Sequence, residues 1–308
     1  MAYIKSCQDH LDQYHQKLKK PRNPEKINFI KKSNVDIYNI TAPFMDSGKR
    51  IIAGRVEPRD TEDSLVQFFT EKNGVWVEVE GSPVFKLQDP FFTRINGQLI
   101  FGGVEIFSYP SKPDMLNWRT VFYKGVNLSD LKCFLRGPDG MKDIRLVQLK
   151  DGSIGIFTRP QGKKGGRGKI GFMRIDSLED LTPKMIEDAP LLENLFLDEE
   201  WGGVNECHLL KSGYVGVLGH IACFDRIGHR HYYPMTFIFN PETKEVFEFS
   251  LLATREDFLP GMAKRPDLVD VVFSGGLIRN PDGSAEFYAG ISDCEAQKIT
   301  VDDPFWHW

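Results

Sequence analysis

Residues 87–103 read LQDPFFTRINGQLIFGG, two apolar segments joined by the dipeptide Asn96-Gly97. Asn-Gly tolerates the positive φ angles of a tight hairpin turn, so this stretch predicts two antiparallel strands. The same pattern, a small turn residue followed by glycine and an apolar strand, recurs along the chain. The other turn dipeptides are Ser47-Gly48, Asp151-Gly152, Ser212-Gly213 and Asp282-Gly283.

The spacing of these turns indicates the architecture. Successive turn glycines lie 49, 55, 61 and 70 residues apart. One four-stranded propeller blade takes about 40–50 residues, and insertions lengthen it. We therefore predict an all-β fold, a five-bladed β-propeller. The uneven spacing argues against a strict repeat of the WD type. Two packed β-sandwich domains are the alternative, but they would not explain why one turn type recurs five times.

Helical signal is confined to two short segments. Residues 5–20 are expected to form a terminal helix, and DSLEDLTPKMIEDA at 176–189 opens with a capping-box pattern from Ser177 to Asp180. We accordingly divide the chain into an N-terminal helical or extended segment, residues 1–30, and a single propeller catalytic domain, residues 31–308.

Composition limits the classes of partner. The net charge of −4 and the pI of about 6.0 give no basic surface for nucleic acid or for an anionic membrane. No apolar run approaches the roughly 18 residues of a membrane span, and the polar N-terminus is not a secretory signal. Five scattered cysteines favour neither a disulfide framework nor a thiolate metal site. These features predict a cytoplasmic protein.

Alignment of the five units on their turn glycines brings acidic residues into register. Asp89, Asp143 and Glu206 lie seven to nine residues before the glycine of their units, and Asn39 holds this place in the first unit. The innermost strand of each propeller blade lines the central channel, so equivalent positions converge. We expect these side chains to face one cavity.

Basic side chains follow the same turns. Arg55, Arg159 and His220 each lie seven residues after a turn glycine, and Asp293 lies ten after the last one. Carboxylates ringed by arginines suit glycosyl transfer, because an acid must protonate the leaving oxygen and cations must hold an anionic nucleophile or leaving group. The competing interpretation is structural, with aspartates that cap turns and arginines that pair with them between blades.

Four stretches resemble the five-bladed glycosidases and mannoside phosphorylases. They are NITAPF with IIAGRVEPRD, then LQDPFFTRINGQLIFGG, MKDIRLVQLKDGSIGIFTRPQG and DVVFSGGLIRNPDGSAEFYAGISD, which together span roughly residues 35–295. The short length and the DIYNITAPF opening are most similar to a family once known only as a domain of unknown function. That family includes protist enzymes that build and phosphorolyse β-1,2-mannan.

The resemblance implies roles for individual residues. Asp89 would be the general acid, acting directly or through a sugar hydroxyl. Asn39, Arg55 and Asp293 would hold the sugar in the donor subsite, and Arg159 would belong to the phosphate clamp. One position departs from the pattern: mannoside phosphorylases carry a lysine just ahead of the fourth-blade glycine pair, where this chain has Glu200 and Trp201.

Other motifs carry weaker signals. We add Arg145 and His231 as candidate phosphate-binding residues. In GHRHYY, residues 228–233, His229 and His231 share a strand face, but no third ligand is evident, so no metal is expected. The basic glycine-rich segment at 161–171 is either a solvated hairpin loop or a lid over a phosphorylated sugar. The C-terminal DPFWHW is interpreted as packing or as a contact in a homo-oligomer, with Trp306 and Trp308 as alternative sugar platforms.

These observations lead to three hypotheses. The first is an inverting glycosyl-transfer enzyme acting on β-mannosides, with inorganic phosphate or a sugar nucleotide as the second substrate and no cofactor. The second is an inverting hydrolase in which Asp89 is the acid and Glu206 or Asp143 activates water. The third is a carbohydrate-binding propeller without catalysis, because fold alone does not determine activity.

Overall fold

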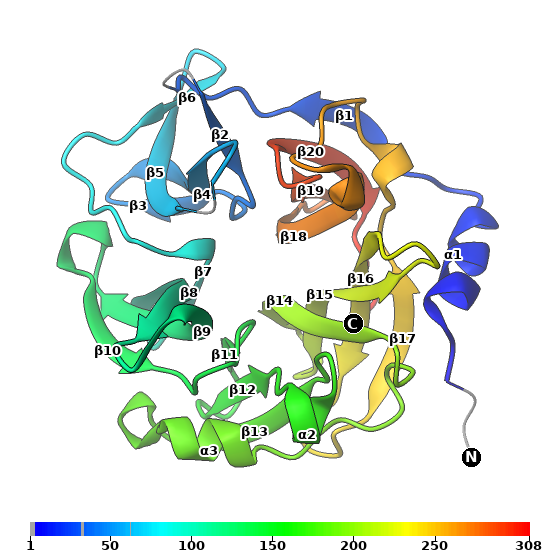
Figure 1. Cartoon of the computed structure of the whole chain (residues 1–308). Coiled ribbons are helices and arrows are strands. Elements are labelled where there is room, and N and C mark those ends of the chain that lie inside the picture. The colour runs from blue at the N-terminus through cyan, green and yellow to red at the C-terminus, as the bar shows by residue number, and fades with distance from the viewer. Residues whose placement is uncertain (1–3, 32–33, 62) are drawn as a thin grey trace.

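The computed structural model describes residues 4–31, 34–61 and 63–308, which form five antiparallel sheets arranged as a ring (Figure 1). The blades follow one another along the chain, so the predicted five-bladed β-propeller is confirmed. The first blade comprises β2 (Val35–Tyr38), β3 (Phe44–Asp46), β4 (Lys49–Pro58), β5 (Leu65–Lys72) and β6 (Val75–Glu78). The second comprises β7 (Gln88–Ile95), β8 (Gln98–Tyr109), β9 (Lys112–Gly125) and β10 (Lys132–Arg136).

The other three blades complete the ring. The third comprises β11 (Arg145–Gln148), β12 (Ile154–Thr158) and β13 (Gly171–Ile175). The fourth comprises β14 (Trp201–Leu209), β15 (Val215–Phe224), β16 (Arg230–Phe239) and β17 (Val246–Leu251). The fifth comprises β18 (Asp270–Arg279), β19 (Ser284–Ile291), β20 (Glu295–Asp302) and β1 (Arg22–Lys26). A short parallel bridge between β16 and β18 joins the last two blades.

Each recurring turn joins two consecutive strands of one blade, but the turns are of two kinds. Ser47-Gly48 and Asn96-Gly97 have positive φ at both residues, as a two-residue type I′ hairpin requires. In the other three turns only the glycine has positive φ, and its N–H donates to the carbonyl three residues earlier. Those three are longer loops with a left-handed glycine, so the expectation of five two-residue hairpins is wrong for them.

Apolar side chains fill the junctions between blades. Phe44 and Phe68 of the first blade pack with Phe101 of the second, and the junctions that follow are filled in the same way. The ring closes through Tyr288 and Ala296 of the fifth blade, which pack against Ile37 and Ile52 of the first. The innermost strands of the blades, β7, β14 and β18 among them, lie next to the centre of the ring (Figure 1).

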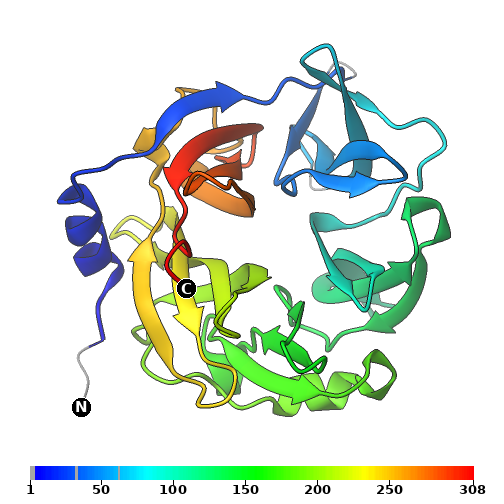
Figure 2. The same ribbon diagram turned by 180° about the vertical axis from the view of Figure 1, so that it is seen from behind.

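The described part of residues 1–30 is attached to the ring. β1 pairs antiparallel with β20 and becomes the outermost strand of the fifth blade (Figure 2). The helix α1 (Cys7–His15) starts at the capping box of Ser6 and places Cys7 and Tyr14 in the core of the fourth blade. The sequence analysis set this segment apart from the propeller, whereas its strand and helix both pack on blades.

The short helices differ from their predicted limits. α1 is shorter than residues 5–20, and α2 (Gly162–Gly165) is a single turn within the basic 161–171 loop. Ser177 begins only the 3₁₀ turn η2 (Leu178–Asp180), while α3 (Pro183–Asp188) has its own cap in Thr182. Pro183 disfavours helical geometry at the preceding residue, so one continuous helix cannot include both η2 and α3.

Three further 3₁₀ turns lie between strands: η1 (Leu128–Asp130), η3 (Arg255–Asp257) and η4 (Pro266–Leu268). The last two belong to the connection from β17 to β18, from which Lys264 contacts Glu57 next to the first blade's inner strands. None of the helices in the described residues has the length and apolar character to span a membrane.

Candidate active site

A cavity of about 220 Å³ lies where the inner strands of the blades meet. The volume is below the ~300–1,000 Å³ of sites for drug-sized ligands and is enough for one sugar ring and a small anion. Seven of the sequence-predicted residues line it: Asn39, Arg55, Asp89, Asp143, Arg159, His220 and Asp293. The structure therefore brings together residues from all five blades.

Four of these residues share an unusual backbone conformation. Asn39, Asp89, Asp143 and Asp293 have φ angles of 44°, 49°, 58° and 50°. This left-handed region costs non-glycine residues roughly 1–2 kcal/mol each, and asparagine and aspartate adopt it most readily. The repeated conformation turns a short polar side chain toward the axis in four of the blades, the first, second, third and fifth. Backbone strain of this kind gathers at functional sites.

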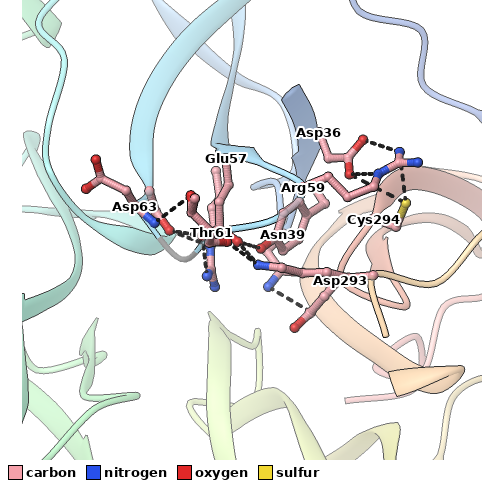
Figure 3. Close-up of polar contacts among 12 residues, drawn as sticks. Asp36, Asn39, Glu57, Arg59, Thr61, Asp63, Asp293 and Cys294 are labelled. Carbon is pink, nitrogen blue, oxygen red and sulfur yellow. Dashed lines mark hydrogen bonds and ion pairs between the residues drawn. The ribbon is translucent and has the colours of Figure 1, made fainter. Parts of the chain in front are cut away.

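One end of the cavity holds a carboxylate pair bridged by an amide. Asn39 Nδ2 donates to Asp89 Oδ1 at 2.8 Å and faces Asp293 Oδ1 at 3.5 Å, as Figure 3 shows for Asn39 and Asp293. Arg55 Nη1 also donates to Asp89 Oδ1, at 3.2 Å. Both donors contact the same oxygen of Asp89. Its Oδ2 has no hydrogen-bond partner among the described residues and is available to a substrate.

Burial raises the pKa of Asp293; the guanidinium of Arg55 lowers it, and the nearby Asp89 raises it again. The pKa of Asp293 is raised on balance, so this carboxyl group keeps its proton to a higher pH than a free aspartic acid does.

A second layer of charges holds Arg55 in place. Glu57, only 1% exposed, accepts from Arg55 Nη2 at 2.6 Å and from Tyr38 Oη at 2.7 Å. Lys264, from the β17–β18 connection, also pairs with Glu57 and donates to the Thr61 carbonyl at 2.8 Å. Figure 3 shows Glu57 and Thr61 next to each other, beside Asn39. The carboxylate of Glu57 thus balances two cations next to the acid pair.

This arrangement predicts opposite pH effects of two substitutions. The charged groups that face the pair are Arg55, Glu57, Lys264 and, through β11, Arg145. Lys264 lowers the pKa of Asp293, so Lys264→Met should raise it and move the alkaline limb of the activity profile to higher pH. Glu57→Gln leaves two cations uncompensated and should move that limb to lower pH.

The measurement is kcat/KM against pH for both variants, with thermal unfolding as a check on folding. Loss of a purely structural contact would lower activity at all pH values without displacing the limb. Shifts of the same sign in the two variants would contradict the assigned electrostatic role.

The opposite end of the cavity is basic. Arg159, 2% exposed, faces Asp143 with Nη1 to Oδ2 at 3.3 Å, and its Nε donates to the Gly202 carbonyl at 2.9 Å. A Cβ on Gly203 would lie 2.8 Å from Arg159 Cδ and 3.0 Å from His220 Cε1, so only glycine fits there. Burial would raise the pKa of Asp143, but Arg159 together with the other nearby cations, Lys142 and Arg145 among them, lowers the pKa to about 2. Asp143 is therefore an ionised partner of Arg159.

His220 is a neutral hydrogen-bonding group. Burial lowers the pKa of His220 to about 3. The carboxylate of Asp143 opposes this shift, and the positive charge of Arg159 adds to it. Its Nδ1 contacts Asn205 Oδ1 at 2.8 Å, and its ring stacks on Tyr232 with centroids 5.4 Å apart. His220 Nε2 is buried and has no hydrogen-bond partner among the described residues. A ligand in the cavity would satisfy it.

Glu206 lies outside the cavity. Its Oε2 accepts from the backbone N–H of Leu277 at 2.7 Å and contacts His208 Nε2 at 2.9 Å. The register of β14 shifts between Val204 and Glu206. A bulge of one residue reverses which side chains face the channel, and the predicted spacing did not include it. The expectation that Glu206 faces the same cavity as Asp89 is wrong.

Two predicted phosphate-binding residues also lie elsewhere. Arg145 stacks on Phe91, 4.0 Å from its ring centroid, and donates to the Asn205 carbonyl at 2.7 Å. His231 Nδ1 contacts Asp270 Oδ2 at 2.6 Å, because residue 231 faces the opposite side of β16 from residues 230 and 232. Both are interblade contacts and do not line the cavity.

Three lining residues that were not predicted are neighbours of predicted ones: Lys142 precedes Asp143, and Arg230 and Tyr232 flank His231. Arg265 also lines the cavity, and no predicted residue lies near it in the sequence. Glu200, at the position of the family lysine, turns away and accepts from the backbone N–H of Cys7 at 2.6 Å. A lysine does line the cavity, but it is Lys142 of the third blade and not a residue of the fourth. Strand alternation around His231 was the signal that could have identified Arg230 and Tyr232.

The family model described as "Protein of unknown function (DUF1861)" matches residues 13–307. The chain belongs to this family. A solved structure similar to this chain is that of MPT-4, a mannose phosphorylase from Leishmania mexicana in complex with phosphate. It is 33% identical, with a TM-score of 0.87 over 97% of this chain and 95% of that one. These findings confirm the family recognised from the four sequence stretches.

Another similar structure is MPT-1, a GDP-Man-dependent mannosyltransferase from Leishmania mexicana, which is 31% identical with a TM-score of 0.87. It covers 97% of this chain and 95% of its own. The β-1,2-mannobiose phosphorylase from Listeria innocua shares the fold at 13% identity, with a TM-score of 0.61 over 88% and 92% of the two chains. No curated protein matches this member of the DUF1861 family.

Proposed function

We propose that the protein is an inverting glycosyl-transfer enzyme that acts on β-mannosides, with Asp89 as general acid. In phosphorolysis, phosphate attacks the anomeric carbon while the glycosidic C–O bond breaks and the leaving oxygen takes a proton from Asp89. Inversion yields α-mannose 1-phosphate, and the reverse reaction transfers mannose to an acceptor. The division of one cavity into a carboxylate end and a cation end carries this proposal.

The carboxylate end suits the sugar. Asp89 Oδ2 is free for the glycosidic oxygen or a sugar hydroxyl, while Asn39, Arg55 and Asp293 offer donors and acceptors around it. Charge-assisted hydrogen bonds of this kind hold polyhydroxyl groups in one orientation. In this proposal these three residues bind the mannosyl unit in the donor subsite, beside the acid.

The cation end suits phosphate. Arg159 and Lys142 supply positive charge, and His220, kept neutral by its lowered pKa, supplies a hydrogen bond. Two relatives at 31–33% identity are described with phosphate and with a GDP-linked sugar. A sugar nucleotide in place of phosphate is therefore the second donor chemistry to test, and a β-1,2 linkage is the first substrate choice.

The hydrolase alternative requires a general base. Glu206 is bound to the β18 backbone outside the cavity, and Asp143, with a pKa of about 2, is a weak base paired with Arg159. An efficient base has a pKa near the working pH. Phosphorolysis needs no such group, because phosphate is itself the nucleophile. This observation favours phosphate over water as the acceptor of the mannosyl group.

Incubation with β-1,2-mannobiose, with and without phosphate, tests the proposal. Mannose 1-phosphate formed only with phosphate supports it, and α configuration of that product by NMR supports inversion. Free mannose formed at the same rate in both incubations would replace it by the hydrolase. No turnover of the mannoside or of GDP-mannose would leave a binding protein. A cytoplasmic location and a homo-oligomer remain predictions from the sequence.

A further inference from the structure

Two cysteines that are far apart in the sequence meet where the helix α1 packs on the fourth blade. Cys7 is the first residue of α1 and is 3% exposed, whereas Cys223 lies near the end of β15 and is half-buried. Both are free thiols, and both pack in the apolar cluster of the fourth blade. A hydrogen bond joins the two thiol groups. The fold therefore forms a dithiol that the spacing of the cysteines does not indicate.

The two thiol groups differ in reactivity. The hydrogen bond to Cys7 lowers the pKa of Cys223; burial opposes this shift, and the nearby His231, its cross-strand neighbour on β16, adds to it. The same hydrogen bond, together with burial and the carboxylate of Glu200, raises the pKa of Cys7. The thiolate is the nucleophilic form of cysteine. Cys223 is therefore the reactive member of the pair, and it is also the more exposed one.

The helix that carries Cys7 has a small packed face. α1 has nine residues, of which Cys7, His10 and Tyr14 are buried. A cavity of about 570 Å³ lies beside Tyr14, and another of about 760 Å³ lies beside His10. Helices shorter than about 12–15 residues are marginal in isolation, so α1 depends on its attachment to the blade. A covalent bond at Cys7 would fasten its first turn to β15.

We propose that Cys7 and Cys223 form a peroxide-responsive dithiol, which closes a reversible disulfide between α1 and β15. The Cys223 thiolate attacks hydrogen peroxide, whose O–O bond breaks, and the products are a sulfenic acid and hydroxide. The sulfur of Cys7 then attacks the sulfenic sulfur. The S–S bond forms as the S–O bond breaks, and the hydroxyl group leaves as water with the proton of Cys7.

This modification site is independent of the proposed function, because neither thiol lines the central cavity. It also agrees with the cytoplasmic location predicted from the sequence. Disulfides are rare in that reducing compartment, and those that occur there are usually transient and redox-sensing. Exchange with a small thiol would reopen the bond and restore both cysteines.

Oxidation of the reduced whole chain with hydrogen peroxide, followed by alkylation of the remaining thiols and peptide mass spectrometry, tests the proposal. We expect a linked Cys7–Cys223 peptide that disappears when dithiothreitol is added before alkylation. The link should raise the melting temperature by roughly 5 °C or more, because it closes a long loop. Cys7→Ser and Cys223→Ser should each lose the linked peptide and the temperature rise. Cys133→Ser, which removes an exposed cysteine of β10, is the matched control and should keep both.

Three results would overturn the dithiol. The first is oxidation of Cys223 to a sulfinic acid while Cys7 is still alkylated, and the second is a disulfide that joins other cysteines instead. The third is a linked peptide without any rise in melting temperature, because the bond would then not fasten α1. If a serine variant unfolds, the linked peptide of the unmodified protein and its loss on reduction still decide the question.

Discussion

Asp89→Asn is expected to lower kcat on an unactivated β-mannoside by about 10²–10⁴ while the protein stays folded. Asparagine keeps the size of the side chain and one oxygen, which can still accept from Asn39 and Arg55. What it lacks is the proton that the leaving oxygen needs. Mannoside binding should therefore remain close to that of the unmodified protein.

The measurement is steady-state turnover of β-1,2-mannobiose together with its binding constant. A mannoside with a strongly acidic phenol as leaving group serves as internal control, because such a group needs little protonation and should be turned over by the variant. Retention of more than about a tenth of the original rate on mannobiose would show that Asp89 is not the acid.

Arg159→Ala should have two separate effects. Loss of a bidentate cation should raise the apparent KM for phosphate roughly tenfold or more, with a small change in mannoside binding. It also leaves the buried Asp143 without its partner, and breaking such a pair costs about 3–5 kcal/mol of stability. The variant should therefore unfold at a lower temperature.

The double variant Arg159→Ala, Asp143→Asn separates the two effects. It removes the unpaired charge, so most of the stability should return while the phosphate KM stays high. Recovery of both properties would indicate that Arg159 only braces the blades. Equal weakening of mannoside and phosphate in the single variant would lead to the same conclusion.

The propeller could be predicted because its determinants are local. A glycine with positive φ after a small polar residue marks each hairpin, and Gly48, Gly97 and their counterparts fall once per blade. Asp89 and Asp143 reach the cavity, as their matched offsets predicted, although the register of β7 shifts between Gln88 and Phe91. Offsets along the chain give only the distance from the turn, so they do not by themselves fix the direction of a side chain where a strand carries a bulge.

The wrongly placed residues lie on strands where a shift of one residue decides whether a side chain faces the cavity or the opposite side of the strand. A bulge in β14 rotates Glu206 toward β18, and simple alternation on β16 places Tyr232 rather than His231 in the cavity. The Glu57–Lys264 pair joins residues 207 positions apart, and nothing local to either position signals it. Contacts between blades form only in the assembled ring, so the sequence around either partner does not predict them.

The closing strand β1 has a consequence for the timing of synthesis. Arg22 lies opposite Thr300, so the strand made first must wait for almost the last one before it can pair. At about 5–20 residues per second, this delay is roughly 15–55 s, during which the edge of β1 and the apolar faces of the first blade lack their partners. Unpaired strand edges invite association with other chains. We therefore expect newly made protein to depend on chaperones until the ring is complete, and folding yield to fall steeply with concentration.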